Sequence, residues 1–187
     1  MTKTALLKNI QDLIHHCGDD PRRDGLLKTP ERVVKSLEFL TSGYSKSVDE
    51  VINGALFDVV YDDMIVVRNI EFYSLCEHHM LPFYGTCHIG YIPDQKILGL
   101  SKFPRIVDIF ARRLQVQERL THELAQSLQE VLSPLGVGVV MEGYHLCMMM
   151  RGVEKQQSFT TTSSMQGCFR TTETRMEFMS HVRSAKP

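Results

Sequence analysis

The sequence predicts an α+β fold built on antiparallel strands. Segments rich in Val, Ile, Phe and Tyr are separated by paired helical segments, without the regular β–α alternation of a parallel sheet. The chain has 187 residues, of which 43% are hydrophobic and 23% charged, as in an ordinary soluble domain with a sizeable core. We therefore expect a single domain over residues 1–187, with a helical part over about 1–56 and a strand-rich part over about 57–187.

Helices are expected before the first strand. Apolar residues recur at helical spacing over residues 4–16, which predicts an amphipathic helix. Thr29 is expected to cap a second helix over residues 30–40, because that helix begins with a proline, which the first helical turn favours. Ser47 and Glu50 have the spacing of a capping box and predict a short third helix.

The middle of the chain is expected to form strands. Residues 59–75 are rich in β-branched and aromatic side chains and predict one long strand or two. Alternation over residues 85–92 predicts another strand, and residues 96–100 a short one. Neighbours in a strand face opposite ways, so Cys87 is interpreted as a core residue and His88 as a polar group of the strand rather than as metal ligands.

The second half of the chain is expected to contain two helices, then two strands, then a closing helix. Apolar spacing and breaker residues place these elements at residues 103–114, 120–131, 137–150, 158–169 and 175–182, in that order. The strand over 158–169 is rich in Thr and Ser, which is typical of an edge strand or a solvated strand.

The candidate chemistry lies in two short runs, Cys76-Glu77-His78-His79 and His145-Leu146-Cys147. Thiolate and imidazole groups are ligands that suit zinc. Cys76 and His79 are three residues apart, so one turn of chain can aim both side chains at one point. In a strand, His145 and Cys147 would share a face, because successive side chains alternate.

The number of ligands bears on function. Cys76, His79 and Cys147 make three, and catalytic zinc sites keep a fourth position for water, whereas structural sites are closed by four protein ligands. His78 and His145 are then left to act as acid–base groups. Two other interpretations stay open on spacing alone: a four-ligand structural zinc, or no metal, with a surface histidine pair near two core cysteines.

Composition argues against several classes of protein. The formal net charge of −1 gives no overall attraction to nucleic acid or membrane, so neither is expected as a partner. The five cysteines are odd in number and unevenly spaced, and no signal peptide or membrane span is evident, which favours a reducing cytoplasm. A nucleoside deaminase would need His-x-Glu together with Pro-Cys-x-x-Cys, and the sequence contains no Cys-x-x-Cys. A zincin would need His-Glu-x-x-His, which is also absent from the sequence.

Several further stretches follow the first run in a specific order and spacing. They are Gly99-Leu100-Ser101-Lys102-x-x-Arg105, Gln115-Val116-Gln117-Glu118-Arg119-Leu120-Thr121, His145-x-Cys147-Met148-x-x-Arg151-Gly152 and Thr160-Thr161-Thr162-Ser163. Together with Cys76-Glu77-His78-His79, these stretches resemble GTP cyclohydrolase I over about residues 29–183.

The resemblance implies an architecture beyond the α+β class. It implies the tunnelling fold, an antiparallel four-stranded sheet with two packed helices, preceded by N-terminal helices. Five such subunits would join their sheets into a pentameric barrel, and two pentamers would stack into a homodecamer with active sites between subunits.

The resemblance also implies a reaction and its machinery. The reaction is the zinc-dependent hydrolysis and rearrangement of GTP to 7,8-dihydroneopterin triphosphate and formate, the first step of tetrahydrofolate and pterin biosynthesis. Cys76, His79 and Cys147 match the zinc ligands. His145 matches the histidine that acts at guanine N7, and His78 matches the one placed near the ribose ring oxygen.

The remaining matches concern GTP itself. Glu118 matches the carboxylate that accepts hydrogen bonds from guanine N1–H and the amino group, with Gln117 beside it. Six residues match triphosphate-binding positions: Arg32, Lys35, Ser101, Lys102, Arg105 and Arg151. A non-catalytic zinc scaffold of the same fold would be expected to lack one of His78, His145 or Glu118, and all three are present. The residues indicate neither allosteric regulation nor which pathway uses the product.

Overall fold

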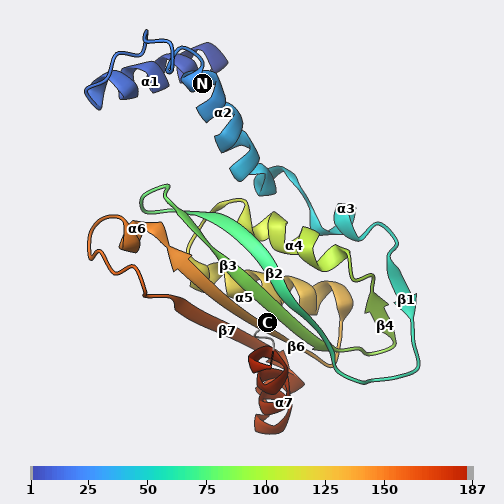
Figure 1. Ribbon diagram of the computed structural model, residues 1–187. Coiled ribbons are helices and arrows are strands. Elements are labelled where there is room, and N and C mark those ends of the chain that lie inside the picture. Colours follow the sequence, from blue (N-terminus) through green and yellow to red (C-terminus); the bar gives the residue numbers. More distant parts are fainter. Residues whose placement is uncertain (1, 185–187) are drawn as a thin grey trace. The chain divides into compact units, whose positions relative to one another are not determined.

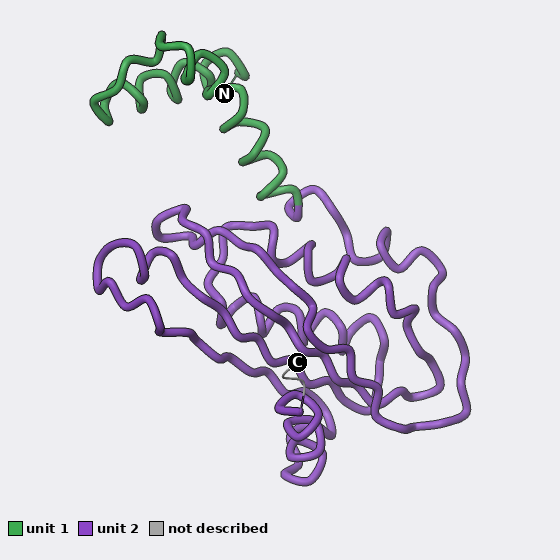
Figure 2. Tube along the Cα trace, viewed as in Figure 1, with its two compact units in different colours: residues 1–42 green, residues 43–187 purple. Residues whose placement is uncertain are grey.

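The computed structural model describes residues 2–184 as a mixture of helices and curled sheet (Figure 1). The predicted α+β class is confirmed. The chain forms two compact units, one up to Ser42 and one from Gly43 onwards (Figure 2). No helix among the described residues is both long and apolar enough to cross a membrane. That the two units work as one domain stays a prediction.

The first unit contains α1 (Lys3–His16) and α2 (Thr29–Leu40). The apolar stripe predicted for α1 is half-buried at best, and Leu13 is 54% exposed. The predicted cap at Thr29 is wrong, because α2 begins one residue earlier than expected. Lys28 occupies the cap position, and the Thr29 hydroxyl instead donates to the Gly25 carbonyl at 3.4 Å.

The short helix η1 (Ser42–Ser45) spans the boundary between the units, and α3 (Val48–Ile52) follows in the second unit. The predicted capping box is confirmed: Ser47 Oγ accepts from the Glu50 N–H at 3.2 Å, and the Glu50 carboxylate accepts from the Ser47 N–H. A small antiparallel pair follows, formed by β1 (Leu56–Asp58) and β4 (Lys96–Leu98). The strand predicted from residue 59 begins only at Ile65, so residues 59–64 are a connection.

The main sheet within residues 43–184 has the strand order β5-β2-β3-β6-β7. Its long strands are antiparallel and comprise β2 (Ile65–Cys76), β3 (Pro82–Ile92), β6 (Gly136–His145) and β7 (Thr160–Gly167). The two-residue strand β5 (Leu114–Gln115) runs parallel to β2. The register pairs Leu75 with Pro82 and Phe83 with His145, so the end of β2, the start of β3 and the end of β6 meet at one end of the sheet.

One face of this sheet carries the main core. The helices α4 (Lys102–Ala111) and α5 (Gln117–Leu132) cover it, as Figure 1 shows. Alternation along β3 places Cys87 in this core with no exposed surface, as predicted. His88 points to the other face and is also buried; its Nδ1 accepts from the Asn69 N–H at 3.3 Å.

A smaller cluster covers the opposite face. It is formed by η2 (Cys168–Arg170) and α7 (Thr172–Arg183), whose Phe169 and Phe178 rings pack edge to face on the sheet. Gly90 and Gly138 make this packing possible. A Cβ added at Gly138 would lie 2.4 Å from Phe169, and one at Gly90 would lie 2.6 Å from Phe178.

The strand predicted over residues 137–150 is too long. β6 ends at His145, and the chain then forms α6 (Leu146–Met149), a single helical turn. Leu and Met are not branched at Cβ and favour helix over strand, which accounts for the early end. His145 and Cys147 therefore do not share a strand face.

Candidate active site

The connection between β2 and β3 is a tight turn that presents two of the predicted metal ligands. The Met80 N–H donates to the Cys76 carbonyl at 2.8 Å, and the Cys76 N–H donates to the Leu81 carbonyl at 2.9 Å. Met80 adopts the left-handed conformation, with φ of 54°, which lets the chain reverse. The turn directs His79 back toward Cys76, with Nδ1 and Sγ 3.8 Å apart. We call residues 76–80 the metal turn.

Cys147 reaches the metal turn from α6. The ligand atoms of Cys76, His79 and Cys147 all lie within 4.8 Å of one another. A tetrahedral zinc ion with bonds of about 2.0–2.3 Å would separate its ligand atoms by roughly 3.5–3.8 Å, so small adjustments suffice. Burial raises the pKa of the Cys147 thiol, and neighbouring Cys76 raises it further. Two thiolates this close favour a compensating cation, so the donor set fits zinc.

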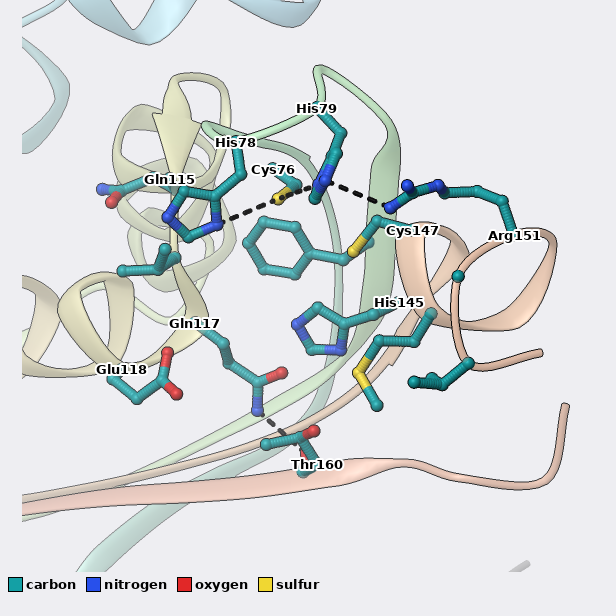
Figure 3. A pocket seen from close by; sticks show the side chains of 15 residues that line it. Cys76, His78, His79, Gln115, Gln117, Glu118, His145, Cys147, Arg151 and Thr160 are labelled. Atoms are coloured by element: carbon teal, nitrogen blue, oxygen red, sulfur yellow. Dashed lines mark hydrogen bonds between the residues drawn. The ribbon is translucent and has the colours of Figure 1, made fainter. Parts of the chain in front are cut away.

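A pocket of about 440 Å³ opens beside these three side chains (Figure 3). Its lining includes most of the residues to which the sequence assigned chemistry, namely Cys76, His78, His79, Gln117, Glu118, His145, Cys147 and Arg151. These residues come from the metal turn, the start of α5, the end of β6 and the α6 region. The register of the sheet brings the two runs together although they are distant in the sequence.

The two histidines outside the ligand set differ in environment. The His145 ring stacks on Phe83, with centroids 4.9 Å apart and planes 3° from parallel. Burial lowers the pKa of His145, and the charge of Glu118 offsets this in part. His78 is more exposed: its Nδ1 lies 3.8 Å from Cys76 Sγ, and its Nε2 lies 3.8 Å from a Glu77 carboxylate oxygen.

Gln117 presents a fixed acceptor. Its Nε2 donates to the Met141 carbonyl at 3.1 Å, the Thr160 carbonyl at 2.9 Å and Thr162 Oγ1 at 3.0 Å. Because acceptors surround this nitrogen, the amide has one favourable orientation. Its Oε1 is buried and has no hydrogen-bond partner within the described chain. Figure 3 shows this oxygen directed toward the side of the pocket that carries His145.

Of the residues predicted to bind the triphosphate, Arg151 alone is among the described residues that line this pocket. Arg151 lines the pocket, with Nη1 3.2 Å from His79 Nε2. Ser101, Lys102 and Arg105 lie around the start of α4, outside the residues that line this pocket, and Lys102 Nζ donates to the Val51 carbonyl at 2.8 Å. Arg32 and Lys35 are exposed on α2 in the first unit.

Phe83 and Thr160 also line the pocket, although the sequence alone assigned neither a role. Thr160 belongs to the motif Thr160-Thr161-Thr162-Ser163, whose residue types indicate no particular chemistry. Phe83 is the Cα partner of His145 across β3 and β6. A correct register would have identified it, but the strand was expected to begin only at residue 85.

Comparison with known proteins identifies the family of this chain. The model of the family described as GTP cyclohydrolase I matches residues 6–183. A protein of Leptospira biflexa named GTP cyclohydrolase 1 is 58% identical over 176 residues, covering 94% of this chain and 96% of that protein. The same name belongs to a Dictyostelium discoideum protein that is 56% identical, covering 97% of this chain and 79% of that one.

A third relative extends the range of organisms. The GTP cyclohydrolase 1 of Campylobacter jejuni is 54% identical over 178 residues, covering 95% of this chain and 94% of that protein. The resemblance found in the sequence is thereby confirmed over almost the whole chain. This chain belongs to the GTP cyclohydrolase I family and is a hydrolase that acts on a small nucleotide.

Proposed function

We propose that this enzyme hydrolyses and rearranges GTP to 7,8-dihydroneopterin triphosphate and formate with the help of a zinc ion. One observation carries the proposal: Cys76, His79 and Cys147 converge within 4.8 Å in a pocket that also contains His145 and Glu118. A metal, a proton donor and a guanine anchor are what opening of the purine ring requires.

Cys76, His79 and Cys147 would hold the zinc. When bound, zinc supplies a Lewis acid that lowers the pKa of a coordinated water toward neutrality. The cluster found among residues 2–184 contains three donors and includes neither His78 nor His145. Three protein ligands are typical of a catalytic site, which supports this interpretation over a closed structural zinc.

His145 is proposed to hold a proton at guanine N7, which makes C8 open to attack. Stacking on Phe83 fixes the plane of the imidazole. Burial lowers the pKa of His145, which makes its imidazolium form a stronger acid toward N7. His78 is proposed to act near the ribose ring oxygen, and its exposure lets it follow the sugar as the ring opens.

Glu118 and Gln117 are proposed to recognise the guanine edge. A carboxylate can accept from both N1–H and the exocyclic amine, whereas adenine has an acceptor at N1 and would leave Glu118 unpaired. The buried Oε1 of Gln117 is a second acceptor on the same wall. Selection of guanine thus rests on two neighbouring residues at the start of α5.

The triphosphate and the assembly are linked in this proposal. Of the described residues that line the pocket, Arg151 is the one lysine or arginine, too few for a triphosphate. We therefore assign the other contacts to Arg32, Lys35, Ser101, Lys102 and Arg105 across subunit boundaries, in a homodecamer of two tunnelling-fold pentamers. A cytoplasmic location and a place at the start of folate and pterin synthesis belong to the same proposal.

The test is an absorbance assay of the purified protein with GTP, with metal content measured on the same sample. We expect a rise in dihydropterin absorbance and one formate per GTP, abolished by a chelator and restored by zinc. Bound zinc without turnover of GTP would contradict the proposal and favour a non-catalytic scaffold.

A variant of His145 can show whether this residue acts as a metal ligand or as the proton donor. His145→Ala should retain stoichiometric zinc and lose ring opening, because His145 lies outside the three-donor cluster. Loss of zinc from that variant would show that His145 is a ligand and would overturn the assignment of roles.

A further inference from the structure

An ion pair connects two of the elements that line the pocket, the metal turn and α5. Glu77 lies in the metal turn between the ligand Cys76 and the proposed catalytic His78, and Arg119 follows Glu118 in α5. Nη2 of Arg119 donates to Oε2 of Glu77. The metal turn and the guanine anchor are therefore connected directly by two side chains to which the proposed function assigns no part.

The arginine end of this pair is fixed by buried structure. Arg119 Nε donates to Gln115 Oε1 at 2.9 Å, and Nη2 also donates to the Leu114 carbonyl at 3.3 Å. Gln115 is only 2% exposed, and its own Nε2 donates to Glu123 at 2.9 Å and to the Phe110 carbonyl at 3.4 Å. The planar guanidinium thus has a single favourable position, set by the buried amide.

The carboxylate end is fixed as well, and it faces a catalytic group. The Glu77 N–H donates to the Gln115 carbonyl at 3.0 Å, which ties the metal turn to β5. While Oε2 contacts Arg119, Oε1 lies 3.8 Å from His78 Nε2. One carboxylate therefore spans the distance between the guanidinium on α5 and the imidazole of the metal turn.

We propose that Glu77 and Arg119 are positioning residues that set the spacing between the reaction centre at the metal turn and the guanine anchor Glu118. The inference rests on the proposed function. Guanine is rigid, and C8 lies at the opposite end from N1 and the amino group. When Glu118 holds one end, the position of the metal turn decides whether the other end meets the groups that open the ring.

The expected effect follows from this geometry. A displacement of about 1 Å between reacting groups costs on the order of 10²-fold in rate, whereas contacts that hold the substrate at its two ends persist. Loss of the pair should therefore lower kcat and leave KM within about threefold, the pattern of an interaction realised in the transition state. A half-exposed ion pair contributes little to folding, so stability should change little.

The experiment is a double-mutant cycle on the zinc-loaded enzyme with Glu77→Gln, Arg119→Gln and the combined variant. Each single variant should lower kcat about 10- to 100-fold at unchanged zinc stoichiometry. The combined variant should be no worse than the poorer single one, because the second change finds the connection already broken. Arg119→Lys, which keeps the charge without the planar fork, should fall between Arg119→Gln and the wild type.

Glu130→Gln is the matched control, since it removes an exposed carboxylate from the same helix, one that accepts from Gln126 and not from Gln115 or Arg119. Its kcat should stay within about twofold of the wild type. Three outcomes would each overturn the inference. The first is a wild-type kcat in Glu77→Gln, and the second is a combined variant in which the two single losses of kcat multiply. The third is a loss of kcat that is explained by a loss of bound zinc. If the wild type itself does not turn over GTP with zinc, it is the proposed function that fails.

Discussion

Gln117 and Glu118 show how adjacent residues can acquire different tasks. Both stand in the first turn of α5, where neighbouring side chains point in different directions. Gln117 is 1% exposed, held between β6 and β7 by its amide nitrogen, whereas Glu118 is exposed on the pocket wall. The first is a rigid acceptor, and the second is an exposed carboxylate whose charge acts on His145.

Glu118→Gln tests the guanine anchor. The amide offers one acceptor oxygen where the carboxylate offers two, so we expect kcat/KM for GTP to fall by about 10²-fold or more. The thermal midpoint should move by less than about 1 °C, because the side chain is exposed. Steady-state kinetics and a thermal melt measure the two effects. Glu130→Gln on the same helix is the control, and a wild-type GTP rate in Glu118→Gln would refute the role.

His88 predicts how stability depends on pH. Burial is the main cause that lowers its pKa from the ordinary 6.5, with Arg68 lowering it and Glu142 raising it to smaller extents. The unfolded chain therefore takes up a proton at His88 at a higher pH than the folded chain does. The stability contributed by neutral His88 is complete above about pH 6.5 and is lost as the pH falls from there through the lowered folded pKa.

The matching measurement is urea unfolding between pH 7.5 and pH 5. The wild type should lose free energy of unfolding below about pH 6.5, and His88→Gln should lose less over the same interval. Glutamine keeps an acceptor for the Asn69 N–H, so the variant is expected to fold. Equal slopes for both proteins would show that His88 is not responsible.

At the scale of elements, the docking of α7 depends on missing side chains in the central strands. Gly90 in β3 and Gly138 in β6 leave room for Phe178 and Phe169 against the sheet. The two glycines are Cα partners across the strands, so the space that they leave for the two rings is continuous. Any added atom there must displace an aromatic ring that has no exposed surface.

Gly138→Ala should therefore destabilise the protein by about 1–3 kcal/mol through overpacking. The predicted Cβ position is 2.4 Å from Phe169 Cδ1. Gly99→Ala is a suitable control, because its Cβ would meet nothing closer than 3.6 Å. Denaturant midpoints at constant m-value measure the difference. A Gly138→Ala variant as stable as Gly99→Ala would mean that the aromatic rings can shift to accept the added methyl group without a loss of stability.

The elements also show what the sequence could and could not predict. Local rules sufficed for the capping box at Ser47 and for the core position of Cys87, because both depend on near neighbours along the chain. Strand ends depended on long-range pairing: β6 stops at His145 and β3 begins at Pro82, both missed by periodicity. The residues proposed as metal ligands were selected by residue type and spacing, but the helical turn that carries Cys147 was not predicted.

At the scale of the whole molecule, the described lining of the pocket contains few of the groups that a triphosphate needs. The pocket proposed to bind guanine has a single lysine or arginine among its described lining residues. β7 has a sheet neighbour on one side only within residues 43–184. Unpaired strand edges favour association with further strands. Both features are expected if neighbouring copies complete the sheet and the site.

Mixing two inactive variants tests this assembly. Cys147→Ala removes a proposed metal ligand, and Arg105→Ala removes a proposed triphosphate contact. If a site takes these residues from different subunits, joint refolding at equal amounts should restore up to about one quarter of the wild-type activity. Native mass measurement should show ten copies. A mixture that stays inactive while decamers form would place both residues in the same subunit's site.

The arrangement of the ligands has a consequence for the order of folding events. Cys76 and His79 are brought together by a local turn, but Cys147 joins them only after β6 has paired with β3. Non-local pairing is slow compared with closure of a short turn. A refolding chain should thus form a weak two-ligand encounter with metal early and reach full affinity late. The rate of tight zinc binding during refolding would then report the rate at which β6 pairs with β3.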